Sequence, residues 1–222
     1  MLNTAVAESF RQFADELENV PSEELSQEID RIVKREFTAH QRIIFNGNGY
    51  GEEWVKEAEE RGLLNLKNTP ETMKHFVNEK NLALFKKHGI YNFSEMQARH
   101  DITLDEYIKV EQIEASTMIY MSDKLIFPAA LKYVSDVSEG IGSIRALGVA
   151  PDADMSLINE MAAKLMKLKG KTAELEGLLK ELPEDIVEAA DYIADRLIPV
   201  MGEIREAADY LERKVAKDYW PY

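Results

Sequence analysis

The part of the chain with the greatest capacity for polar contact is the stretch "RIIFNGNGYGEEWV", residues 42–55. Its glycines could in principle expose backbone amides to a phosphate group. A phosphate-binding P-loop requires Lys and Ser or Thr after its last glycine, but Glu52 and Glu53 follow Gly51 here. The glycines also recur at every second residue, which is not the spacing of a dinucleotide fingerprint. The sequence therefore predicts no nucleotide site in this loop.

Two interpretations of the loop remain open. Asn and Gly both tolerate positive φ, so the segment could be a plain turn between two helices. Two amide side chains and several unhindered backbone amides nevertheless offer more hydrogen-bonding groups than a turn needs. The alternative is a loop that faces another protein surface, and its candidate contact residues are Asn46, Gly47, Asn48, Gly49 and Tyr50.

No other arrangement of residues predicts catalysis or metal binding. Cys is absent, and His40, His75, His88 and His100 are scattered without an H-E-x-x-H or Glu-x-x-His pattern. "RHD" at 99–101 resembles half of a phosphohydrolase motif, but no companion His is evident. We therefore expect no catalytic residue and no metal ligand in this chain.

Composition limits the classes of partner. The chain has 222 residues, of which 41 are acidic and 27 basic, giving a net charge of −14. Such a chain repels nucleic-acid backbones, so nucleic-acid binding is not expected. No apolar run is long enough to cross a membrane. The sequence predicts a protein that has a sizeable core and binds neither nucleic acid nor a membrane.

Apolar residues recur at helical spacing in nearly every long segment, and no strand-like alternation extends beyond four residues. We expect a short helix within 92–102 and a long one from about 103 to 147, kinked by Pro128. Two further helices, with 4-3 apolar spacing over 161–182 and 186–211, flank a turn at Pro183, and Pro199 should bend the second. The predicted fold is all-α: an irregular helical N-terminal part followed by an elongated antiparallel three-helix bundle with kinked helices. Three aromatic residues in the terminal "DYWPY" should dock on another surface.

Several stretches resemble the C-terminal region of type III glutamine synthetases, the long bacterial form. They are "RIIFNGNGYGEEWVKEAEERGLLNLKNTPE", "EYIKVEQIEASTMIYMSDKLIFPA" and the ending "DYWPY". "LNTAVAESF" looks like the last helix of that family's catalytic domain. The resemblance implies three parts: 1–20, the last helix of a truncated catalytic domain; 21–102, a helical part with the Asn/Gly-rich loop; and 103–222, the long-helix bundle.

The resemblance also implies a function. The parent enzyme would be a cytoplasmic homo-oligomer that ligates ammonia to glutamate with ATP and Mg or Mn. The family's metal, nucleotide and glutamate ligands lie upstream of Leu2, so the 222 residues alone should be an inactive structural or assembly module with no cofactor. The Asn46–Tyr50 loop would then contact the catalytic domain or a neighbouring subunit.

A second interpretation is a stand-alone helical interaction protein, an adaptor of the coiled-coil kind. The 4-3 apolar seams could be satisfied within the chain or between two chains. We expect the first interpretation because the chain begins within a helical pattern and stops abruptly at "WPY".

Overall fold

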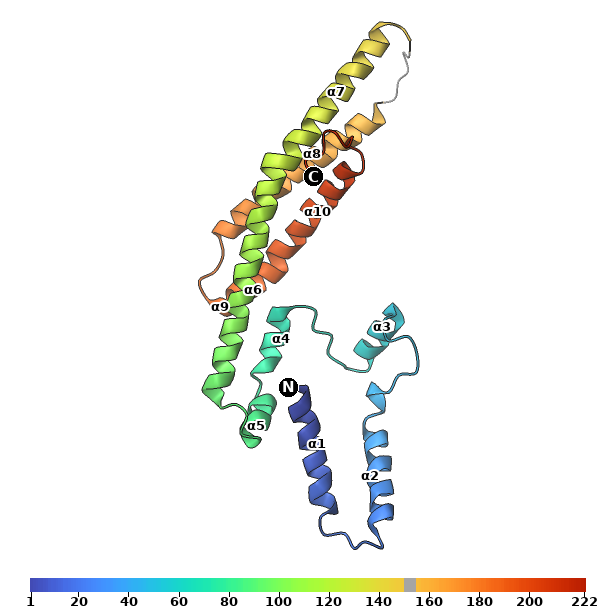
Figure 1. The fold of residues 1–222 in the computed structure, drawn as a ribbon, viewed down its shortest axis with the longest axis vertical. Helices are drawn as coiled ribbons and strands as arrows, with labels where there is room; N and C mark the ends of the chain where they lie inside the picture. Colours follow the sequence, from blue (N-terminus) through green and yellow to red (C-terminus); the bar gives the residue numbers. More distant parts are fainter. Residues whose placement is uncertain (150–154) are drawn as a thin grey trace. The chain divides into compact units, whose positions relative to one another are not determined.

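A computed structural model describes residues 1–149 and 155–222. Every regular element in these residues is a helix, and they contain no strand (Figure 1). The all-α prediction is therefore confirmed. The chain divides into two compact units, residues 1–100 and 101–222, which we describe separately.

The first unit consists of short helices. They are α1 (Leu2–Leu17), α2 (Leu25–Ala39), the 3₁₀ turn η1 (Gln41–Ile43), α3 (Glu52–Glu60), α4 (Thr69–Phe76) and α5 (Glu79–Lys87). Asn68 and Asn78 begin α4 and α5, each accepting a hydrogen bond from a backbone N–H three residues later. Gly62 and Gly89 follow α3 and α5 with φ of 71° and 62°, values that suit glycine.

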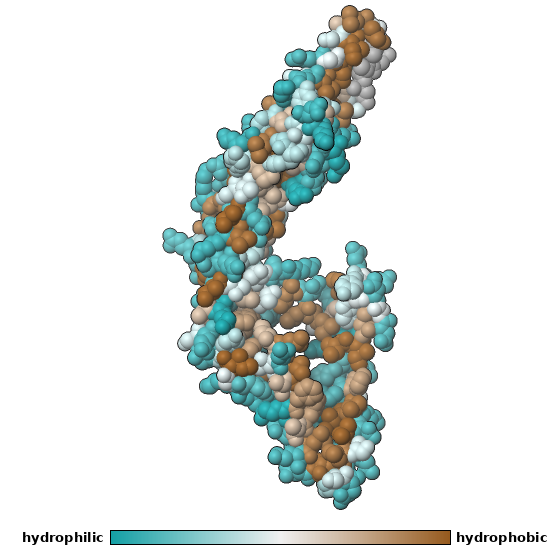
Figure 2. Space-filling view, viewed as in Figure 1, coloured by the Kyte–Doolittle hydropathy of each residue, from teal (hydrophilic) through white to brown (hydrophobic). Residues whose placement is uncertain are grey.

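The first unit buries little of its apolar surface. Ile32, Phe85 and Met96 are buried, but Phe10 on α1 and Phe37 on α2 remain 68% and 63% exposed. Figure 2 shows apolar side chains gathered over these two helices. The apolar stripes of α1 and α2 are therefore only partly buried by packing within this chain.

A charge cluster on Glu8 connects α1 to α5. Its carboxylate accepts hydrogen bonds from Lys87 and Gln12 and lies 2.8 Å from Nε2 of His88. The Lys87 contact is the largest cause that holds the pKa of Glu8 well below its usual range, followed by Arg11. This contact joins residues about eighty positions apart in sequence.

The long helices form the second unit, although α6 begins before it. They are α6 (Phe93–Met121), the π-helical segment η2 (Ser122–Ile126), α7 (Phe127–Ala146), α8 (Ser156–Lys180), α9 (Ile186–Tyr192), the π-helical segment η3 (Ile193–Leu197) and α10 (Ile198–Glu212). The expectation of a separate short helix within 92–102 is wrong, because these residues continue into α6 without a break. Asn92 and Glu95 cap its start by reciprocal hydrogen bonds, and neither Gly nor Pro occurs within α6.

Pro128 and Pro199, which lie within the long helical rods, each follow a π-helical segment. The N–H of Phe127 bonds to the carbonyl of Ser122, and that of Ile198 bonds to Ile193, each spanning five residues. Pro128 and Pro199 come directly after these bonds. In a regular helix the proline ring would clash with the carbonyl four residues earlier, and the wider π turn leaves room for it. The helical rod therefore continues through each proline.

Helices α7, α8 and α10 pack side by side, and successive helices run in opposite directions (Figure 1). The 4-3 seams of α8 and α10 are buried within the chain: Met161, Leu165, Leu168, Leu175, Ile204, Ala207 and Leu211. Thr172 lies in the same seam, and its hydroxyl donates a hydrogen bond of 2.8 Å to the carbonyl of Leu168. The seams thus have partners without a second copy.

The aromatic C-terminal segment docks on α7, as its composition predicts. Tyr133 of α7 meets the Tyr219 ring edge-on, with centroids 5.2 Å apart, and Lys132 lies 4.7 Å from the centre of the Tyr219 ring. Trp220 packs against the bundle core. Tyr219 and Trp220 therefore pack against the second unit, whereas Tyr222 remains 63% exposed.

Polar groups interrupt the inner side of α6. Burial raises the pKa of Tyr107 to about 12, with the charges of Glu111 and Asp195 adding to the effect. Burial also raises the pKa of Glu111, and the charge of Glu114 contributes. One carboxylate oxygen of Glu111 and the hydroxyl of Tyr192 are buried without a hydrogen-bond partner among the described residues.

Candidate contact loop

The five predicted contact residues lie consecutively between η1 and α3, and all five are exposed. Asn48 organises the turn: its Oδ1 accepts a hydrogen bond from the N–H of Tyr50 at 3.1 Å. Its carbonyl accepts another from the N–H of Gly51 at 3.0 Å. The chain reverses here through an Asn-centred turn, after which Gly51 starts α3.

An aromatic pair braces the base of the loop. Phe45 stacks on Trp54 of α3 with ring centroids 4.4 Å apart and an interplanar angle of 24°. Gly47 lies directly over the Phe45 ring, where an added Cβ would be 2.5 Å from Cζ. Gly49 has open space around it. Only the first of these two glycines is required by close packing.

Arg61 fastens the two ends of the segment. Its Nη1 donates hydrogen bonds to the carbonyls of Ile44 at 2.9 Å and Arg42 at 3.2 Å. The same guanidinium pairs with Glu57 and lies 5.6 Å from the centre of the Trp54 ring. These contacts hold the loop against α3. Sequence reasoning did not find Arg61, because its partners are mostly backbone carbonyls, which leave no pattern of residue types.

The five candidates therefore differ in role. Gly47 and Asn48 shape the loop, and Gly49 has open space around it. The side chains of Asn46 and Tyr50 form no hydrogen bond with the described residues. Tyr50 is fully exposed, at 101% of its reference area. An aromatic ring held in water on a braced loop is available for contact with another surface.

The loop does not suit a phosphate group. Glu52 and Glu53 occupy the first turn of α3, so the helix terminus that could attract an anion already carries two negative charges. In the part of the chain that the structure describes, no group of three or more His, Asp or Glu residues is placed to hold a metal ion. None of the described helices is long and apolar enough to span a membrane.

Comparison with known proteins identifies the family. The chain is 34% identical over 210 residues to the glutamine synthetase of Butyrivibrio fibrisolvens, covering 90% of this chain and 29% of that protein. It is 30% identical over 230 residues to the type-3 glutamine synthetase of Dictyostelium discoideum, covering 100% of this chain and 31% of that protein. A glutamine synthetase of Bacteroides fragilis is 25% identical, with 32% of it covered.

The chain thus spans about three tenths of the length of these relatives. The family model for the glutamine synthetase C-terminal domain matches residues 28–145, which include the contact loop and most of α6 and α7. The resemblance noted from the sequence is confirmed. Because the match covers more than half of the chain, the protein belongs to the glutamine synthetase C-terminal domain family.

Proposed function

We propose that this chain serves as a non-catalytic structural and assembly module of a glutamine synthetase. The whole enzyme would be a cytoplasmic homo-oligomer that joins ammonia to glutamate with ATP and Mg or Mn. The 222 residues would contribute neither metal nor nucleotide ligands. The Asn46–Tyr50 loop would contact the catalytic part of the enzyme or a neighbouring subunit.

One observation carries the proposal for the loop: Tyr50 is completely exposed, although the loop beneath it is braced. Phe45, Trp54 and Arg61 hold the loop in place, and none of these bracing contacts involves the side chain of Asn46 or Tyr50. A preorganised loop loses little conformational entropy on binding. Exposed tyrosines on such loops are frequent interface anchors, because one ring supplies both apolar area and a hydroxyl.

The alternative of a stand-alone coiled-coil adaptor receives less support. An adaptor of that kind would present its 4-3 seams to a partner, but Leu165, Leu175 and Leu211 are each at most 1% exposed within the chain. Seams that are already buried cannot bind a second helix without opening the bundle. The match to a glutamine synthetase domain also favours the module.

The test uses the full-length enzyme that carries this chain. A double variant that combines Asn46→Ala and Tyr50→Ala removes the two side chains that form no hydrogen bond. It leaves the Asn48 turn and the aromatic stack intact. We expect smaller oligomers in analytical ultracentrifugation or at least a tenfold loss of synthetase activity. Tyr120→Ala, which removes a tyrosine that is also exposed but lies on α6, is the matched control. Wild-type activity together with wild-type oligomer size in the double variant would refute the contact role.

A further inference from the structure

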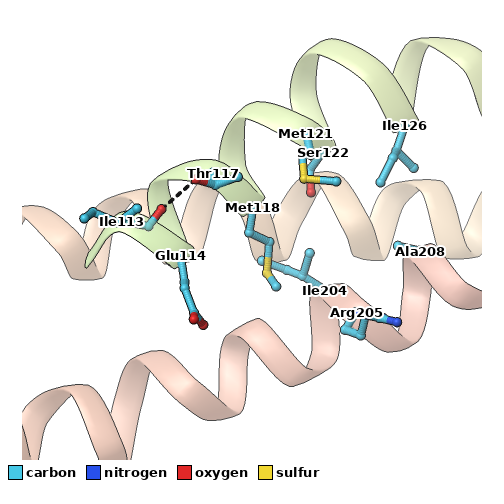
Figure 3. A pocket seen from close by; sticks show the side chains of 10 residues that line it. All are labelled: Ile113, Glu114, Thr117, Met118, Met121, Ser122, Ile126, Ile204, Arg205 and Ala208. Atoms are coloured by element: carbon cyan, nitrogen blue, oxygen red, sulfur yellow. Dashed lines mark hydrogen bonds between the residues drawn. The ribbon is translucent and has the colours of Figure 1, made fainter. Parts of the chain in front are cut away.

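A cavity of about 290 Å³ opens beside η2 in the second unit, between the end of α6 and α10 (Figure 3). Six apolar side chains line it: Ile113, Met118, Met121, Ile126, Ile204 and Ala208. In Figure 3, Met118 from α6 and Ile204 from α10 point toward each other across the space. The interior is apolar, and methionine side chains are flexible enough to close around different small molecules.

Two features of the sequence create this space. The π-helical segment η2 begins at Ser122 and ends at Ile126, both of which line the cavity. A π turn widens the helix and breaks the regular interdigitation of side chains, and such turns are frequent at functional sites. On the opposite wall, Ala208 presents only a methyl group where a larger side chain would fill the gap.

The charges beside the cavity do not cancel. Arg205 is paired on its own helix with Asp209, Nε to Oδ1 at 2.6 Å. The carboxylate of Glu114 extends from α6 toward α10 (Figure 3) and forms no hydrogen bond or ion pair with the described residues. The free charge at this cavity is therefore negative.

We propose that this cavity binds a small amphiphilic amine. The alkyl part would occupy the space between Met118 and Ile204, and the ammonium group would pair with Glu114. An apolar pocket with one convergent charged group is the usual form of a small-molecule site, and the modest volume limits the ligand to a short chain. Burial of the alkyl chain would supply most of the affinity, while the carboxylate would select a cationic head group.

The proposal can be tested on the purified 222-residue chain, independently of any synthetase activity. Hexylammonium, hexanol and hexanoate share one alkyl chain and differ in head-group charge. Each is titrated while the methionine methyl signals are followed by NMR. We expect saturable shifts of Met118 and Met121 with hexylammonium, roughly tenfold weaker binding of hexanol, and no binding of hexanoate. Equal binding of hexanol, preferred binding of hexanoate, or the absence of saturable shifts would overturn the proposal.

Three variants sharpen the test. Glu114→Gln keeps the shape of an exposed side chain and should weaken hexylammonium binding roughly tenfold, whereas Glu106→Gln on the same helix should leave it unchanged. Ala208→Leu fills the cavity and should abolish binding. Equal affinity of the Glu114→Gln variant and the wild type would remove the ammonium assignment. Tighter binding of the zwitterion norleucine, or shifts of the same methyl signals on raising the protein concentration alone, would assign the cavity to another occupant and overturn the proposal.

Discussion

The hydroxyl of Tyr219 donates a hydrogen bond of 2.7 Å to Asp136, a residue of α7 that lies 83 positions earlier in the chain. This hydrogen bond is the largest cause that lowers the pKa of Asp136, and Lys132 adds to it. The C-terminal aromatic segment is thus held by a charged contact as well as by ring packing. The contact connects the last residues to the middle of the bundle.

We predict that Tyr219→Phe lowers Tm at pH 7 by roughly 1–3 °C, because the ring packing stays and only the hydroxyl is lost. A lowered folded-state pKa contributes stability above the unfolded pKa, about 3.9 for Asp, and this contribution is lost as pH falls through the folded value. The difference from wild type should therefore shrink in melting curves recorded at pH 2. Tyr222→Phe is the control, and an equal Tm for Tyr219→Phe and wild type at pH 7 would contradict the assignment.

The two loop glycines should respond differently to the same substitution. Gly47→Ala places a methyl group against the Phe45 ring and should cost about 1–3 kcal/mol of local stability. Gly49→Ala meets open space and should cost less than about 0.5 kcal/mol. The readout is the fluorescence of Trp54 during urea denaturation, in a Trp220→Phe background that leaves one tryptophan. Similar losses in both variants would show that the stack does not constrain the loop.

Arg61→Lys should loosen the loop while retaining the positive charge. Lysine cannot reproduce the fork of donors that contacts the Ile44 and Arg42 carbonyls. Loss of about 1 kcal/mol of hydrogen bonding should speed amide exchange of residues 42–51 by roughly five- to tenfold. Hydrogen exchange followed by mass spectrometry measures this directly. Arg42→Lys, whose own side chain lies exposed, should leave the exchange rates unchanged, and unchanged rates in Arg61→Lys would exclude its bracing role.

Glu111→Gln should stabilise the protein in a pH-dependent manner. Burial raises the folded-state pKa of Glu111, so its ionisation opposes folding above that pKa. Below the unfolded value, about 4.3 for Glu, the carboxyl is protonated in both states and the penalty disappears. The variant should raise Tm by roughly 1–3 °C at pH 7 and leave it unchanged at pH 3. A gain of equal size at both pH values would indicate a packing effect instead.

Helical periodicity predicted the all-α class correctly, because apolar stripes determine which backbone conformation can bury side chains. It was less successful where local signals competed. Residues 92–102 looked like a short separate helix, whereas Asn92 caps the start of one long helix that includes them. The prolines predicted a kink at Pro128 and a bend at Pro199, but not the five-residue π turns that precede them. That choice depends on packing around the turn, which residue types alone do not reveal.

The loop was found from the sequence because Asn and Gly have distinctive backbone preferences. Its support was not found, since the Phe45–Trp54 stack and Arg61 depend on how α3 folds back. Glu111 and Glu114 look like ordinary solvated acids in the sequence. Only the structure places Glu111 partly buried and Glu114 beside an apolar cavity.

The two π turns make the long rods sensitive to residue number. Each turn accommodates one residue more than a regular helix, and the bundle-facing positions after it depend on that extra residue. Removing a single residue from Ser122–Ile126 would convert the π turn into a regular helical turn, in which the ring of Pro128 clashes with the carbonyl four residues earlier. Length in these two segments is consequently under tighter constraint than residue type.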